Sequence, residues 1–206
     1  HGTEKVKNEH ILSDIKKKPI NDTIRILYVS TVKKYKHQWN LIDAVGLLRK
    51  KGVSVELHLV GGGDSQALNL MQDAIHRNKS EKNFIFYHGG LPHEETLEWY
   101  HKADIFVFPS TCENLPVILL EAMTAGLPIA SSDRGPMPEV LKDAGLYFNP
   151  ESVTSIKNCL RYLIENPDLM QSLGLKAKKY SEDYSWIKCA DETFAFLSNV
   201  YEKNKT

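Results

Sequence analysis

The sequence has few cysteines and no net charge. Cys112, Cys159 and Cys189 are its only cysteines in 206 residues, and they lack the spacing of metal ligands. This small, odd number argues against a disulfide scaffold and favours a reducing compartment, so we expect each thiol to be a small buried hydrophobe. The 26 basic residues balance 26 acidic ones. Charge therefore gives no reason to expect nucleic acid as the main partner.

Long apolar runs are also missing, and the first residues do not have the pattern of a leader sequence. No apolar run approaches the ~20 residues that a membrane-spanning helix needs. The chain begins His1-Gly2-Thr3-Glu4, which is neither a signal peptide nor an initiator methionine. We therefore expect a fragment or a processed chain that lacks part of an active site. Its composition, 42% hydrophobic and 25% charged, is typical of a globular protein.

Short β-branched runs alternate with amphipathic helical stretches from residue 24 onward. The predicted strands span residues 24–30, 53–60, 84–87, 105–108, 128–131 and 145–148. The predicted helices span residues 41–51, 65–78, 93–101, 116–125, 152–165, 168–180 and 186–201. This alternation predicts an α/β fold, a doubly wound parallel sheet of about six strands with helices at its C-terminal end.

The domain organisation follows from the same pattern. Residues 1–22 contain a lysine run and little to bury, so they are interpreted as a lead-in or interdomain linker. Residues 23–206 form the predicted domain. Aromatic residues of its last helices, such as Trp186, Phe194 and Phe196, are expected to pack those helices together.

Ligands of such a sheet bind at the carboxyl ends of the strands. Gly61-Gly62-Gly63-Asp64 follows a predicted strand, but it matches neither the dinucleotide-binding nor the P-loop pattern. The sequence therefore lacks the main motif that would indicate a dehydrogenase or a P-loop phosphotransferase. The glycine run then indicates either a flexible turn or a close backbone approach to a ligand.

The loop after the first strand is basic. It contains Lys33, Lys34 and Lys36, close to the predicted start of a helix, where a phosphate group would bind. A solvated basic loop is the alternative interpretation.

Residues 109–123 carry the most specific pattern. Glu113 ends a loop, and Glu121 lies in an apolar helix where a carboxylate needs hydrogen-bond partners. Backbone N–H groups from Asn114 to Val117 are available at the start of that helix, except at Pro116. These features predict an anion cradle flanked by two carboxylates suited to sugar hydroxyls. A glycosidase pair is an alternative, although hydrolysis explains neither the lysines nor the cradle.

With these motifs in their order and spacing, the sequence resembles the retaining glycosyltransferases of family 4, in particular the C-terminal donor-binding half of their GT-B fold. Glu113 and Glu121 match the E-x7-E motif of that family. Residues 103–110, 125–131 and 135–139 match the flanking segments, and residues 186–201 match the closing helix. The resemblance covers residues 24–201.

The resemblance implies a role for each matching residue. Glu113 and Lys36 would be the catalytic residues, with Glu113 beside the donor sugar and Lys36 neutralising the diphosphate. Glu121 would bind the ribose hydroxyls. The remaining donor-binding positions lie in three loops: they are Ser30 and Thr31; His88, Gly89 and Leu91; and the backbone amides of Asn114 and Leu115. The loop from His88 to Leu91 would meet the nucleobase, largely through backbone groups, and the two amides would hold the diphosphate.

The resemblance also implies the wider function. The partners would be a nucleotide-sugar donor, with a UDP-sugar favoured, and a glycan or lipid-linked acceptor bound by a missing N-terminal domain. A hexose or N-acetylhexosamine would be transferred in cell-surface polysaccharide or lipopolysaccharide synthesis, in the cytoplasm or on the cytoplasmic face of a membrane. No metal and no other cofactor is expected. The isolated chain would be poorly active.

One departure from the family keeps other functions open. The family has Gly-Arg after the first strand, where this chain has Ser30-Thr31, so the usual arginine charge is absent. Lys33, Lys34 or His37 would have to compensate. A non-catalytic nucleotide-binding or partner module, or a nucleotide-sugar epimerase of the same fold, are the alternatives.

Overall fold

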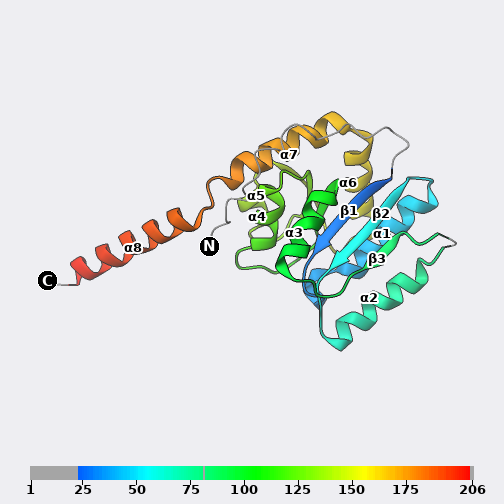
Figure 1. The fold of residues 1–206 in the computed structure, drawn as a ribbon, viewed down its shortest axis with the longest axis horizontal. Coiled ribbons are helices and arrows are strands. Elements are labelled where there is room, and N and C mark those ends of the chain that lie inside the picture. The colour runs from blue at the N-terminus through cyan, green and yellow to red at the C-terminus, as the bar shows by residue number, and fades with distance from the viewer. Residues whose placement is uncertain (1–22, 81, 205–206) are drawn as a thin grey trace.

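The computed structural model describes residues 23–80 and 82–204, which contain a six-stranded parallel sheet (Figure 1). The predicted linker, residues 1–22, lies outside the described residues. The strands are β1 Ile24–Val29, β2 Val55–Val60, β3 Ile85–Tyr87, β4 Ile105–Phe108, β5 Ile129–Ser132 and β6 Gly145–Phe148.

The strand order is β3-β2-β1-β4-β5-β6, and each neighbouring pair is parallel. The order reverses between β1 and β4, so the chain winds first toward one edge of the sheet and then toward the other. This confirms the predicted doubly wound α/β fold. In such sheets the crevice outside the carboxyl ends of the two strands at the reversal is the preferred ligand position.

Helices cover both faces of the sheet (Figure 1). Helices α1, α2 and α6 pack together on one face, and α3, α4, α5 and α7 lie on the other. The helices are α1 Gln38–Lys50, α2 Ser65–Arg77, α3 His93–Lys102, α4 Val117–Thr124, α5 Met137–Leu141, α6 Val153–Glu165, α7 Pro167–Ser181 and α8 Trp186–Lys203, with a short 3-10 helix η2 at Lys34–Lys36.

The core lies on both faces of the central strands. All four residues of β4 are buried, as are the last four residues of β1. Such strands are apolar on both faces because helices exclude water from each side. Tyr28 of β1 packs edge-on against Phe108 of β4, so the core reaches to the carboxyl ends of these two strands.

Helix α8 differs from the other helices because it extends away from the body (Figure 1). None of its residues is buried, and Trp186, Phe194 and Phe196 are 51%, 69% and 66% exposed. The expectation that these aromatic residues pack the last helices together is therefore wrong. No helix in the described part of the chain has the length and apolar character needed to span a membrane.

Candidate functional site

The carboxyl ends of β1 and β4 bring together two loops that are far apart in the sequence. Lys36 follows β1 in η2, and Glu113 follows β4 in the loop before α4. The Lys36 ammonium group contacts the Glu113 carboxylate directly, and both side chains are largely buried, at 6% and 14% exposed. The two residues predicted to be catalytic therefore form one buried ion pair at the point where the strand order reverses.

Aromatic rings surround the Lys36 side chain. Its ammonium nitrogen lies 5.3 Å from the ring centroid of Tyr35 and 5.5 Å from that of Phe108. The Tyr28 hydroxyl, buried beneath this loop, donates a hydrogen bond of 3.0 Å to the Lys36 carbonyl. Burial raises the pKa of Tyr28 well above its usual value, so the hydroxyl keeps its proton and stays a donor. These contacts hold the Lys36 ammonium group in an apolar setting. A positive charge attracts an anion more strongly there than in water.

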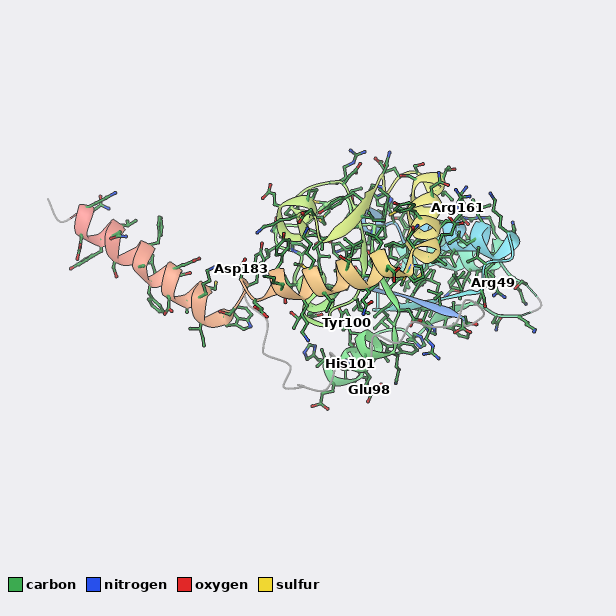
Figure 2. The ribbon with its side chains drawn as sticks, turned by 90° about the horizontal axis from the view of Figure 1, so that it is seen from above. Arg49, Glu98, Tyr100, His101, Arg161 and Asp183 are labelled. Carbon is green, nitrogen blue, oxygen red and sulfur yellow. The ribbon has the colours of Figure 1, made fainter. Side chains whose placement is uncertain are left out.

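Glu121 is held by a second tyrosine. The Tyr100 hydroxyl, on α3, donates a hydrogen bond of 2.9 Å to Glu121 Oε2, and Tyr100 is only 2% exposed. Burial and the neighbouring carboxylate raise the pKa of Tyr100. Figure 2 shows Tyr100 pointing toward the body, whereas Glu98 and His101 of the same helix point outward. Tyr100 thus partners the carboxylate that the apolar helix α4 could not satisfy alone.

The start of α4 supplies part of the predicted anion cradle. The Val117 N–H group donates to the Leu115 carbonyl at 3.0 Å, so it is not available to a ligand, contrary to the prediction. Within residues 23–80 and 82–204, the N–H groups of Asn114 and Leu115 donate to no protein acceptor. Two of the predicted donors therefore remain, close in the chain to Glu113.

The glycine run after β2 packs against the protein itself. A Cβ atom at Gly61 would lie 2.1 Å from the Ser30 carbonyl oxygen, and one at Gly63 would lie 2.5 Å from Val32 Cβ. These two glycines are therefore required for close packing of the β1 and β2 loops, which is neither of the predicted alternatives. A Cβ at Gly62 or Gly89 would meet no atom within 4 Å.

The predicted nucleobase loop begins at His88, at the end of β3. His88 Nε2 and His58 Nδ1 are 3.2 Å apart, and the indole ring of Trp99 covers both imidazoles at centroid distances of 4.3 and 4.5 Å. Burial lowers the pKa of both histidines. This aromatic cluster anchors the segment that continues through Gly89 to Leu91.

The structure places the residues expected to replace the family arginine. Thr31 is exposed, and Ser30 is buried with its hydroxyl donating to the Thr31 carbonyl. Lys33 pairs with Asp64 at 3.0 Å, at the surface. The His37 imidazole lies 3.2 Å from the Thr111 hydroxyl, and burial lowers its pKa. His37 therefore favours the neutral form, which does not replace a fixed positive charge.

Sequence reasoning missed Tyr28, Tyr100 and Thr111, because each acts by contact with a residue of another structural element. It was also wrong about Cys112, which is exposed beside Glu113 rather than buried. Cys159 is largely buried, and burial raises the pKa of its thiol to about 12.

A separate hollow of about 220 Å³ lies at the opposite edge of the sheet, with Arg49, Lys50, Arg77 and Phe84 in its lining. Figure 2 shows Arg49 at the end of the molecule remote from α8. The three cations lie in the last turns of α1 and α2, where they complement the helix dipoles. Interaction with the helix dipoles therefore explains these three cations without a bound ligand.

Comparison of the sequence with known proteins identifies its family. Residues 11–180 match the family described as Glycosyl transferases group 1. The chain is 31% identical over 146 residues to sulfoquinovosyl transferase SQD2 of Arabidopsis thaliana, covering 65% of this chain and 29% of that protein. It is 26% identical over 167 residues to O-antigen chain mannosyltransferase B of Escherichia coli, covering 81% and 44%.

Solved structures share the fold. Sucrose-phosphate synthase from Thermosynechococcus elongatus superposes with a TM-score of 0.78 at 20% identity, covering 90% of this chain and 47% of that one. Anabaena HepE, solved in complex with UDP, gives 0.77 at 19% identity, covering 87% and 50%. The chain spans less than half the length of the curated relatives described above. Because one family matches most of the sequence and the sheet has the architecture of its structural neighbours, the chain belongs to the group 1 glycosyl transferases.

Proposed function

We propose that this chain is the donor-binding part of a retaining glycosyltransferase that uses a nucleotide sugar, with a UDP-sugar favoured. The observation that carries the proposal is the ion pair of Lys36 and Glu113 at the carboxyl ends of β1 and β4. The two N–H donors at Asn114 and Leu115 and the carboxylate of Glu121 lie in the same loop and the helix that follows it.

Each group of the site suits one part of such a donor. Lys36 and the amides of Asn114 and Leu115 would balance the negative diphosphate. Glu113 would accept hydrogen bonds from sugar hydroxyls, and Glu121 from the ribose hydroxyls. The segment from His88 to Leu91 would contact the base through its backbone.

The reaction requires no covalent nucleophile from this chain. The bond between the anomeric carbon and the diphosphate oxygen breaks, and an acceptor hydroxyl oxygen bonds to the same face of that carbon. The acceptor proton passes to the departing phosphate oxygen. Lys36 and the helix-start amides stabilise the charge that develops on this leaving group, because they are already oriented before the reaction.

The acceptor and the setting belong to the whole protein. We propose that a further domain binds a glycan or lipid-linked acceptor, that a hexose or N-acetylhexosamine is transferred in cell-surface polysaccharide synthesis, and that the protein acts in the cytoplasm or at its membrane face. The SQD2 and O-antigen mannosyltransferase relatives, named for sugar transfer, support this class of reaction.

A thermal-shift panel of UDP, GDP, ADP and their common sugars tests donor binding. We expect one base to raise the melting temperature, since a ligand that binds only the folded state stabilises it by RT ln(1 + [L]/Kd). Glu121→Ala should abolish the shift, whereas Glu192→Ala, on the exposed helix α8, should preserve it. An unchanged shift in Glu121→Ala would overturn the ribose assignment, and no shift with any nucleotide would overturn donor binding by this chain.

A non-catalytic module of the same fold is the second candidate, and the uncharged, exposed Thr31 favours it. The two functions differ in one measurement. A catalytic domain requires Glu113 for turnover in the complete protein, whereas a module would bind nucleotide and show no transfer with or without Glu113→Ala.

A further inference from the structure

The ion pair of Lys36 and Glu113 joins two loops, and the residues beside it link the same loops through the backbone. The Tyr35 carbonyl accepts hydrogen bonds from the Thr111 N–H group at 2.8 Å, the Thr111 hydroxyl at 3.2 Å and the Ser110 hydroxyl at 3.4 Å. Tyr35 directly precedes Lys36, and Thr111 lies two residues before Glu113.

The residue after Lys36 has an unusual backbone. His37 has a φ of 52°, in the left-handed region that side chains with a Cβ atom rarely adopt. It ends η2 and is the residue before α1. Glycine would adopt this conformation without strain, but it has no side chain to make the contacts that follow.

The imidazole of His37 holds this conformation through three neighbours. Its Nε2 lies 3.2 Å from the Thr111 hydroxyl, and its Nδ1 lies 3.4 Å from Asn40 Nδ2. Asn40 Nδ2 also donates to the Pro150 carbonyl at 2.9 Å, which attaches the group to the loop after β6. The ring packs edge-on against Trp39 at a centroid distance of 5.9 Å.

The hydrogen bonds of Thr111 and Asn40 determine the tautomer of His37. The Thr111 hydroxyl has one proton, which it donates to the Tyr35 carbonyl, so its oxygen accepts from His37 Nε2–H. His37 Nδ1 then carries no proton and accepts from the Asn40 amide. Burial lowers the pKa of His37, an effect that the carboxylate of Glu151 opposes, and the neutral ring agrees with this arrangement.

We propose that Thr111 and His37 are positioning residues that hold Lys36 and Glu113 in register for the donor diphosphate and sugar. Their role rests on the proposed function, because it assumes that this ion pair meets the donor. The chain Asn40–His37–Thr111–Tyr35 fixes the backbone on both sides of Lys36 and two residues before Glu113. A histidine in a glycine-like conformation is explained by this connection, which glycine could not make.

Nuclear magnetic resonance of the 206-residue chain tests the connection without any ligand. Imidazole ¹⁵N shifts should report the Nε2–H tautomer for His37, assigned by its loss in His37→Asn. The ammonium protons of Lys36 should exchange slowly with water while the ion pair is intact. Thr111→Val should give a mixture of His37 tautomers and faster Lys36 exchange, whereas Thr111→Ser should preserve both signals. A His37 in the Nδ1–H form, or Lys36 exchange unchanged in Thr111→Val, would overturn the proposal.

Nucleotide binding tests the consequence for the site. The probe is the nucleoside diphosphate among UDP, GDP and ADP that binds the unsubstituted chain. Thr111→Val should weaken its binding about tenfold, since one lost hydrogen bond of this kind is worth about that factor. Thr111→Ser should change it less than about twofold. Thr193→Val, which removes a threonine hydrogen bond on the exposed helix α8, is the matched control.

His37→Asn keeps the proposal testable if Thr111→Val does not fold, because asparagine tolerates the left-handed region. We expect it to fold, to lose the contact with Thr111 and to weaken nucleotide binding about tenfold. Unchanged binding in a folded His37→Asn would overturn the positioning role. If no nucleotide binds the unsubstituted chain, donor binding by this chain fails, and the resonance experiment still decides whether Thr111 and His37 position the ion pair.

Discussion

At the residue scale, the ion pair of Lys36 and Glu113 determines the electrostatics of the candidate site. Breaking a buried pair by removing one partner costs about 3–5 kcal/mol, because the other charge is left in an apolar setting without compensation. Lys36 therefore requires an anion, and in the described residues Glu113 supplies it. In the proposed function, the donor diphosphate would take over that role, which would free Glu113 for the sugar.

Glu113→Gln separates these two roles. We expect turnover in the complete protein to fall by at least about 100-fold, because the amide cannot replace a preorganised carboxylate charge. Affinity for the nucleoside diphosphate without its sugar should rise several-fold, since Lys36 then lacks its protein anion. Calorimetry and a transfer assay measure the two effects. Weaker diphosphate binding would show that Glu113 does not compete with the diphosphate for Lys36.

Tyr100→Phe removes the hydrogen bond that holds Glu121. We expect a loss of about 1–2 kcal/mol in the free energy of unfolding, because the carboxylate loses a buried donor. Nucleoside affinity should fall as well, since Glu121 is then free to rotate. Chemical denaturation measures the first effect, with Tyr162→Phe on the exposed side of α6 as the control. A stability equal to that of the unsubstituted chain would mean that the hydrogen bond does not form.

At the element scale, the histidine cluster connects β2, β3 and α3. His58 and His88 face each other beneath Trp99, and the other charged groups near His58 are Glu56, 3.6 Å from its Nε2, and Arg25. Burial and the mutual repulsion of the two rings lower the pKa of His58 more than Glu56 raises it. The folded chain therefore binds fewer protons here than the unfolded chain.

Stability should consequently depend on pH near neutrality. Because the folded-state pKa values of His58 and His88 are lowered, their contribution is complete above the unfolded value of about 6.5 and is lost as the pH falls below it. We expect the free energy of unfolding to decrease between pH 7 and pH 5. His88→Gln should flatten this dependence, whereas His101→Gln, at the exposed end of α3, should not. An equally steep decrease in His88→Gln would assign the dependence to other groups.

Helix α8 should contribute little to the stability of the body. None of the residues of α8 is buried, so removal of this helix exposes little buried apolar area. We expect truncation after residue 185 to leave the melting temperature of the remaining chain within a few degrees of the original, as differential scanning calorimetry would measure. Truncation after residue 165, which removes the buried Leu173 and Ala177 of α7, should destabilise it strongly. A large loss on the first truncation would show that α8 is held against the body in solution.

Sequence periodicity predicts the long elements of this fold well, because each buries one apolar face against the sheet. Periodicity does not predict the short elements η2 and α5, because three or five residues cannot show a helical period. As candidate site residues, Glu113, Glu121 and Lys36 could be found from their motifs, and their roles stay predictions. Tyr100 and Thr111 could not, because their roles depend on contacts that cross between elements and carry no local pattern.

At the scale of the whole molecule, we expect nucleotide binding to be independent of metal ions. In the proposed function, Lys36 and the amides at the start of α4 would supply the positive charge that a divalent cation supplies in other sites. A chelator such as EDTA should therefore leave the nucleotide-induced thermal shift unchanged. Restoration of a lost shift by added Mg²⁺ or Mn²⁺ would show that the site requires a metal.

The close packing of Gly61 against Ser30 and of Gly63 against Val32 has a consequence for protein engineering. The Gly61 N–H group also donates to the Gly89 carbonyl, so three successive loops at the carboxyl edge are fitted to one another. A chimera that imports one of these loops from a relative would bring a backbone shaped for different neighbours. Donor specificity should therefore be transplanted between members of this family by exchanging the loops after β1, β2 and β3 together, as one cassette.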